Sequence, residues 1–75
     1  MFTKYLTANG WTETTKSVHY TKIHWQIIFD TSSWIEVGTK NNTRIFDMPV
    51  PKSNDYESVL SHIEQVCEAD DQLHN

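Results

Sequence analysis

Three carboxylates and one tryptophan near the middle of the chain are the side chains whose types and spacing could support chemistry. Asp30 and Glu36 flank Trp34, and Asp47 follows in the next apolar segment. Such carboxylates could bind a divalent cation or act as an acid and base pair. Catalysis, however, needs a concave site that excludes water, and the strand pattern described below places these side chains on an open sheet face. We therefore expect a binding surface here and no catalytic residues.

The other metal-binding and nucleophilic side chains lack the spacing that a site requires. His19 and His24 are an odd number of residues apart, which in a regular strand places them on opposite faces. His62 and His74 have no partner at a spacing typical of metal ligands. Cys67 is the only cysteine and falls on the apolar side of a predicted helix, where it should behave as a small hydrophobic residue. We expect neither a metal nor a cofactor.

Alternation of apolar and polar residues predicts three consecutive antiparallel strands, at Ile23–Phe29, Trp34–Lys40 and Thr43–Val50. Neighbouring side chains of a strand point to opposite faces. Odd-numbered side chains from position 23 to 37 and even-numbered ones from 46 to 50 should therefore share one apolar face, which becomes the core side of the sheet.

Two tight turns set the register of this meander. A three-residue loop at 31–33 joins the first two strands, and a two-residue turn at Asn41-Asn42, where asparagine tolerates positive φ, joins the second and third. These loops predict the pairs Asp30 with Trp34, Phe29 with Ile35, Ile27 with Val37, Lys40 with Thr43, Val37 with Phe46 and Ile35 with Met48. The opposite face then presents a mixed surface of Ile28, Asp30, Trp34, Glu36, Ile45 and Asp47. Within it Glu36 lies directly opposite Asp47, and like charges placed in this way repel.

The segment before the meander predicts a short helix and an irregular strand. Phe2–Asn9 should be helical, with Gly10 as the left-handed residue that ends it and Trp11 resting on Leu6 in a Schellman ending. Thr12–Tyr20 is compatible with a strand, but its alternation is weak and out of phase with the next strand. If the two segments formed one continuous strand, Val18 and Tyr20 would face outward, so we expect a bulge or turn at 20–22.

A C-terminal helix is the last predicted element. Pro49-Val50-Pro51 should end the sheet, because proline cannot donate to a strand ladder. Asn54 is expected to cap the helix, with Glu57 three residues later, and Ser53 is the alternative cap. An apolar stripe at spacings of three and four on a helix of about three turns should cover the sheet, through Tyr56, Val59, Leu60, Ile63, Val66 and Cys67. Residues 70–75 are expected to fray.

These elements predict one small α+β domain over residues 1–75. It has a short N-terminal helix, a three- or four-stranded antiparallel meander and a C-terminal helix packed on one sheet face. A chain of this length buries only roughly 60 to 65% of its unfolded surface, so a homodimer or a partner-bound state is a reasonable expectation. The single cysteine, the absence of a signal-peptide pattern and the absence of a long apolar run predict a cytoplasmic protein that does not enter a membrane.

Composition narrows the class of partner. The formal net charge is −4, with six basic and ten acidic side chains. Proteins that bind nucleic-acid backbones neutralise phosphates with Lys and Arg, so this balance argues against nucleic acid and favours a basic protein surface.

From these observations we expect a non-enzymatic protein-binding module that acts through its exposed sheet face or edge. An accessory protein of a phage or mobile element, inhibiting a host protein in the host cytoplasm, would fit the small size and the lack of a catalytic motif. The alternatives are a nucleic-acid-associated protein that stacks bases on Trp34 and a small metal-dependent enzyme. One structural question stays open, because segment 12–20 or the N-terminal helix could instead fold over Trp34.

Overall fold

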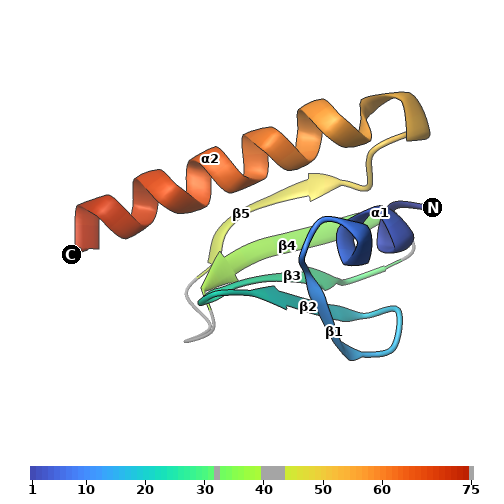
Figure 1. The fold of residues 1–75 in the computed structure, drawn as a ribbon, viewed down its shortest axis with the longest axis horizontal. Helices are drawn as coiled ribbons and strands as arrows, with labels where there is room; N and C mark the ends of the chain where they lie inside the picture. The colour runs from blue at the N-terminus through green and yellow to red at the C-terminus, as the bar shows by residue number, and fades with distance from the viewer. Residues whose placement is uncertain (32, 40–43, 75) are drawn as a thin grey trace.

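The computed structural model describes residues 1–31, 33–39 and 44–74. Five strands form one antiparallel sheet in the order β1-β2-β3-β4-β5, so each strand pairs with its neighbour in the sequence (Figure 1). The elements are α1 (Phe2–Ala8), β1 (Thr12–Thr15), β2 (His19–Lys22), β3 (Trp25–Phe29), β4 (Trp34–Thr39), β5 (Arg44–Pro49), the 3-10 turn η1 (Ser53–Asp55) and α2 (Tyr56–His74). The predicted α+β fold is confirmed, but the sheet has five strands where we predicted three or four.

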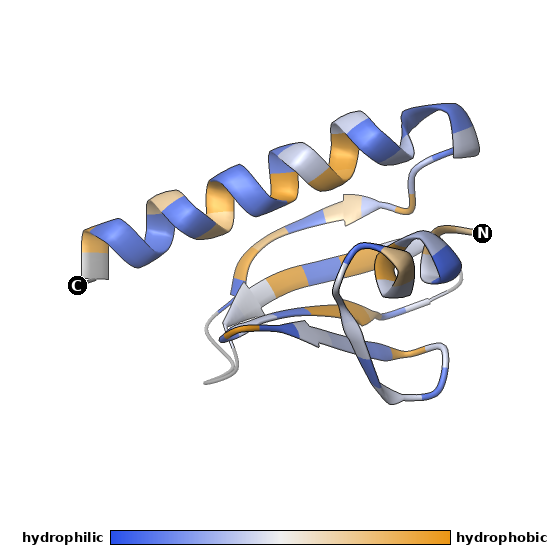
Figure 2. Cartoon of the chain, viewed as in Figure 1, coloured by the Kyte–Doolittle hydropathy of each residue, from blue (hydrophilic) through white to orange (hydrophobic). Residues whose placement is uncertain are grey.

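Both helices cover the same face of the sheet, called the inner face below; the opposite face is called the outer face. Figure 1 shows α2 running along the inner face, and Figure 2 shows the hydrophobic positions of α2 on the side turned toward the sheet. α1 packs on this face too, because the ring of Phe2 lies 6.4 Å from that of Phe29 and 5.3 Å from that of Tyr56. The buried apolar side chains are Phe2, Leu6, Trp11, Tyr20, Trp25, Ile27, Ile35, Val37, Leu60, Ile63 and Cys67. Their removal from water is the main force that holds the layers together.

The predicted register of the central strands is confirmed. Phe29 pairs with Ile35, Ile27 with Val37, Ile35 with Met48 and Val37 with Phe46. The backbone N–H of Asp30 donates to the carbonyl oxygen of Trp34 at 3.1 Å, as the three-residue loop requires. β5 is an edge strand that ends at Pro49, as the prolines predicted. The predicted turn at Asn41-Asn42 and its flanking pair lie outside the described residues.

The prediction that Ile23 begins a strand and faces the core was wrong. β3 begins only at Trp25, and Lys22 pairs with Trp25 across a tight turn made by Ile23 and His24. The backbone of Ile23 has φ of +58°, and its side chain is 66% exposed. A β-branched residue in this left-handed region is strained. The alternation of apolar and polar residues continues through Ile23 in the sequence, but the backbone turns there and the strand begins two residues later.

The segment from Thr12 onward forms a hairpin and not one irregular strand. β1 and β2 pair across a turn that contains Ser17 at φ of +59°. The turn expected at 20–22 lies slightly later, at Ile23, and the parity of β2 therefore differs from the expected one. Tyr20 is completely buried on the inner face, where it pairs with Ile27.

The predicted ending of α1 is confirmed. Gly10 has φ of +91°, a conformation that glycine adopts without steric cost. The backbone N–H of Trp11 donates to the carbonyl oxygen of Leu6 at 3.1 Å, which is the long bond of a Schellman motif. Trp11 and Leu6 are both buried, so this ending also delivers a large aromatic side chain to the core.

α2 begins and ends differently from expectation. Asn54 does not cap the helix but lies inside η1, where the backbone N–H of Asp55 donates to the carbonyl oxygen of Lys52 at 2.8 Å. The helix continues to His74, although we expected residues 70–75 to fray. Asp71 accounts for the extra turns, because its carboxylate accepts hydrogen bonds from the indole Nε1 of Trp25 at 2.6 Å and from His24. Within the described residues no helix combines the length and apolar composition needed to cross a bilayer.

The strain at Ile23 gives a stability prediction. Asparagine tolerates the left-handed region better than isoleucine, and little buried surface is lost because the side chain is mostly exposed. Ile23→Asn should therefore stabilise the fold by about 1 kcal/mol, which raises Tm by roughly 4–8 °C in a domain of this size. Thermal melts followed by circular dichroism measure the change. Val18→Asn is the matched control, since Val18 is exposed in a turn without positive φ; an equal gain there would contradict the explanation.

Candidate functional site

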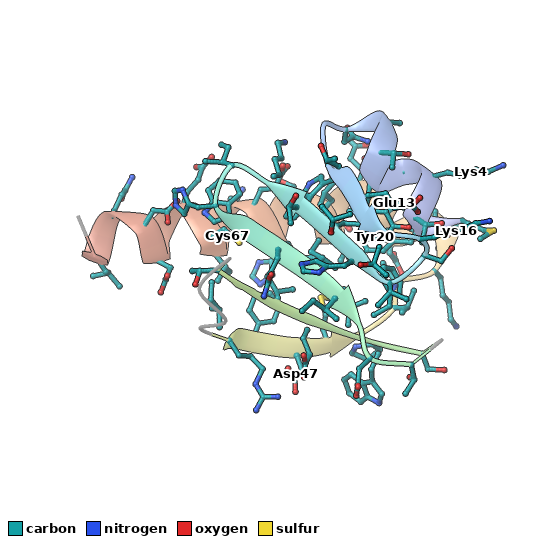
Figure 3. All side chains as sticks on the ribbon, turned by 90° about the horizontal axis from the view of Figure 1, so that it is seen from below. Lys4, Glu13, Lys16, Tyr20, Asp47 and Cys67 are labelled. Atoms are coloured by element: carbon teal, nitrogen blue, oxygen red, sulfur yellow. The ribbon has the colours of Figure 1, made fainter. Side chains whose placement is uncertain are left out.

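The outer face carries most of the residues that the sequence predicted for binding. Ile28 pairs with Glu36, and Glu36 pairs with Asp47, so the predicted row across three strands is present. Trp34 lies opposite Pro49 in the next row. Figure 3 views the sheet from the side opposite α2, with Asp47 on β5.

Trp34 is exposed. Its side chain is 47% accessible to solvent, whereas both other tryptophans of the chain are buried. The hairpin β1–β2 and helix α1, which could have folded over it, lie elsewhere: β1 is the opposite edge of the sheet, and α1 packs on the inner face. The question left open by the sequence is therefore answered in favour of an exposed indole.

The repulsion expected between Glu36 and Asp47 is reduced by an arginine that sequence reasoning did not assign to the site. Arg44 Nη1 donates to Glu36 Oε1 at 3.2 Å and to Asp47 Oδ2 at 3.4 Å. All three side chains are partly exposed, so each ion pair contributes only about 0–1 kcal/mol. No signal in the sequence indicated this contact, because residues three apart in a regular strand point to opposite faces.

A β-bulge brings Arg44 to this place and removes Ile45 from the predicted surface. Val37 pairs with Phe46, but Gly38 pairs with Arg44, so Ile45 is an extra residue on β5. Ile45 packs against the core instead of standing on the outer face. Its assignment to the binding surface was therefore wrong, because the prediction assumed an unbroken ladder up to the turn.

Ile28 has neighbours that alternation could have identified. His19 pairs with Ile28 on the outer face, and the ring Nε2 of His19 lies 2.8 Å from Oε1 of Gln26. Gln26 is buried although it belongs to the outer face. His19 and Gln26 thus place a hydrogen-bonded polar pair beside Ile28, which is half-buried.

Four of the six predicted residues meet in one recess. The recess has a volume of about 300 Å³ and is lined by Asp30, Trp34, Ile35, Glu36 and Asp47. A smaller hollow of about 130 Å³ adjoins it along the strand direction and includes Ile28, Glu36 and Arg44. The larger volume is at the lower end of the range for ligand pockets. It is suited to one side chain or another small group.

Metal ligation and thiol chemistry find no support among the described residues. No group of three or more His, Cys, Asp or Glu side chains there is arranged to hold a metal ion. Cys67 is completely buried, and burial raises the pKa of its thiol to about 12, with Asp71 and Asp70 adding to the shift. The thiol is therefore protonated at neutral pH, in agreement with the structural role expected for it.

The burial of Cys67 and the raised pKa of its thiol predict that it reacts slowly in the native protein. A thiol-specific disulfide reagent should label the native protein at pH 8 far more slowly than it labels the protein in denaturant, because only the exposed thiolate reacts. The absorbance of the released aromatic thiolate measures both rates. Rapid, complete labelling of the native protein would show that the thiol is accessible and that its assignment to the core is wrong.

A hydrogen bond between two residues with shifted pKa values, Glu13 and Tyr20, joins the edge strand β1 to the core. The phenol of Tyr20 donates to Glu13 Oε2 at 2.6 Å (Figure 3). Burial, and then this bond, raise the pKa of Tyr20 to about 12. The bond from Tyr20, followed by the backbone N–H of Ser17, lowers the pKa of Glu13. Neither group lines the recess of the outer face.

These two shifts predict the pH range over which the pair stabilises the fold. The contribution of Glu13 is present above its unfolded pKa of 4.5 and is lost as pH falls below it. The contribution of Tyr20 is complete below its unfolded pKa of 10.0 and is lost as pH rises toward about 12. The Tm difference between the wild type and Tyr20→Phe should therefore be constant from pH 6 to 9 and shrink on both sides. A difference that is unchanged at pH 11 would contradict this account.

Comparison with protein-family models, with curated proteins and with solved structures finds no match for this chain. Its function must therefore be argued from the geometry of the outer face. The feature that distinguishes this face is an exposed indole in an acidic recess.

Proposed function

We propose that this protein is a non-enzymatic module that binds a basic surface of another protein through the outer face of its sheet. The observation that carries the proposal is Trp34, which is 47% exposed and lines a recess together with Asp30, Glu36 and Asp47. Large aromatic side chains at the centre of an interface often supply a disproportionate share of the binding energy. An indole left in water on an otherwise ordered sheet is a ready anchor of this kind.

Charge supports a basic partner over the other classes. The three carboxylates of the recess are opposed by a single described cation, Arg44, so the outer face keeps a negative excess. This excess would repel nucleic-acid phosphates, although Trp34 could otherwise stack a base. Two copies of the same acidic face would also repel each other, which disfavours a homodimer built on this surface.

The proposal includes the setting in which such a module would act. A single free thiol in the core is compatible with a reducing compartment, so we place the protein in the cytoplasm. An accessory protein of a phage or mobile element that binds and inhibits a host protein would need only a surface of this type. No cofactor or membrane is part of the proposal.

The proposal predicts the behaviour of Trp34→Ala. The wild type, immobilised on a resin, is used to capture its partner from a lysate of the organism that encodes it, and the purified partner is then titrated calorimetrically. Trp34→Ala should weaken binding at least tenfold, while circular dichroism shows an unchanged fold. Leu73→Ala is the matched control, because Leu73 is an exposed apolar side chain on α2, away from the recess, and should bind like the wild type.

Three results would contradict the proposal. Equal binding by Trp34→Ala and the wild type would place the interface elsewhere. Unfolding of Trp34→Ala would make this tryptophan a core residue. Binding of single- or double-stranded nucleic acid that weakens steeply with salt would support the nucleic-acid alternative instead.

A further inference from the structure

The carboxylates of the recess retain acceptor atoms that Arg44 does not use. Within the described part of the chain, the guanidinium of Arg44 donates to Glu36 Oε1 and to Asp47 Oδ2, and both bonds come from a single nitrogen, Nη1. Among the described residues, the second oxygen of each carboxylate and both carboxylate oxygens of Asp30 have no hydrogen-bond donor. The recess thus combines several free acceptors with one exposed aromatic surface.

Arg44 also shows which kind of cation suits these carboxylates. A guanidinium can lie between Glu36 and Asp47, bridging two side chains that repel each other. Its planar shape allows hydrogen bonding at the edge while a face stacks on an aromatic ring, which a lysine ammonium cannot do. A second guanidinium on the other side of the pair would meet Asp30 and the indole of Trp34.

We propose that the recess binds one guanidinium group, supplied by an arginine side chain of the basic partner. The guanidinium stacks on the indole of Trp34 and donates hydrogen bonds to Asp30 and to the oxygens of Glu36 and Asp47 that Arg44 leaves free. This inference rests on the proposed function and specifies it, because it identifies the side chain of the partner that the site selects. A volume of about 300 Å³ accommodates one such side chain.

Other occupants satisfy the recess less well. An apolar side chain would cover Trp34 but would also remove the carboxylates from water without giving them donors, which is unfavourable. A metal ion would need at least three ligands at coordination distance, and the described residues form no such group. A guanidinium satisfies both parts of the surface at once.

Short peptides test the inference without knowledge of the partner. Acetyl-Gly-Arg-Gly-amide is titrated into the ¹⁵N-labelled protein, and the indole N–H resonance of Trp34 is followed with the backbone amides of Asp30, Glu36 and Asp47. The matched probes carry citrulline, which is nearly isosteric but uncharged, or lysine. The arginine peptide should shift these resonances with saturation and bind at least fivefold more tightly than the citrulline peptide, with lysine between them.

Two variants separate the recess from general electrostatic attraction. Asp30→Asn should lower the affinity for the arginine peptide at least threefold, and it should bring that affinity close to the value for citrulline. Glu68→Gln removes an exposed carboxylate of α2 and should have no effect. This control is needed because residues 53–75 contain six of the ten carboxylate side chains and no Lys or Arg.

The outcomes distinguish this inference from the proposed function. Equal affinity for arginine and citrulline, or shifts confined to α2, would overturn the guanidinium site. If those results came with Trp34-dependent binding of the captured partner, the interface would stand and only its arginine preference would be wrong. If Trp34→Ala also left partner binding unchanged, both proposals would fall.

Discussion

One strand register determines both faces of this protein. Val37 lies between Ile27 and Phe46, and Ile27 lies opposite Tyr20, so four strands contribute to a single apolar row. Side-chain direction alternates along each strand, and this row therefore decides the direction of every neighbouring residue. Once α1 and α2 cover the row, Trp34 and the carboxylates must face the other way. The exposed acidic surface follows from the same pairing that forms the core.

The bulge in β5 changes the character of that surface. A regular ladder would have placed Ile45 on the outer face and left Glu36 and Asp47 without a described cation between them. The extra residue turns Ile45 toward the core and brings Arg44 to the carboxylates. The bulge thus reduces the exposed apolar area of Ile45 and allows Arg44 to form ion pairs with Glu36 and Asp47. The result is an outer face on which the exposed indole of Trp34 lies beside paired charges, as far as the described residues show.

The central strands could be predicted because alternation and loop length agree there, and each tests the other. The failures have physical causes that residue types do not reveal. Nothing in an isoleucine signals the left-handed backbone of Ile23, and the turn at Ser17 lacks the Gly or Asn that marks most tight turns. Ile45 was misplaced because a bulge has no fixed sequence signature. The last turns of α2 depend on Asp71 meeting Trp25, a contact between distant parts of the chain.

The order of the strands has a consequence for the speed of folding. Every strand of the sheet pairs with the strand that precedes or follows it, so each pairing closes only a short loop and little chain entropy is lost before contacts form. Hairpins of this kind form in about 1–10 μs. The sheet can therefore grow by zippering from any of its turns. α2 meets the sheet through side chains, and its contact between Trp25 and Asp71 spans 46 residues, so docking this helix closes a much longer loop than any strand pairing does.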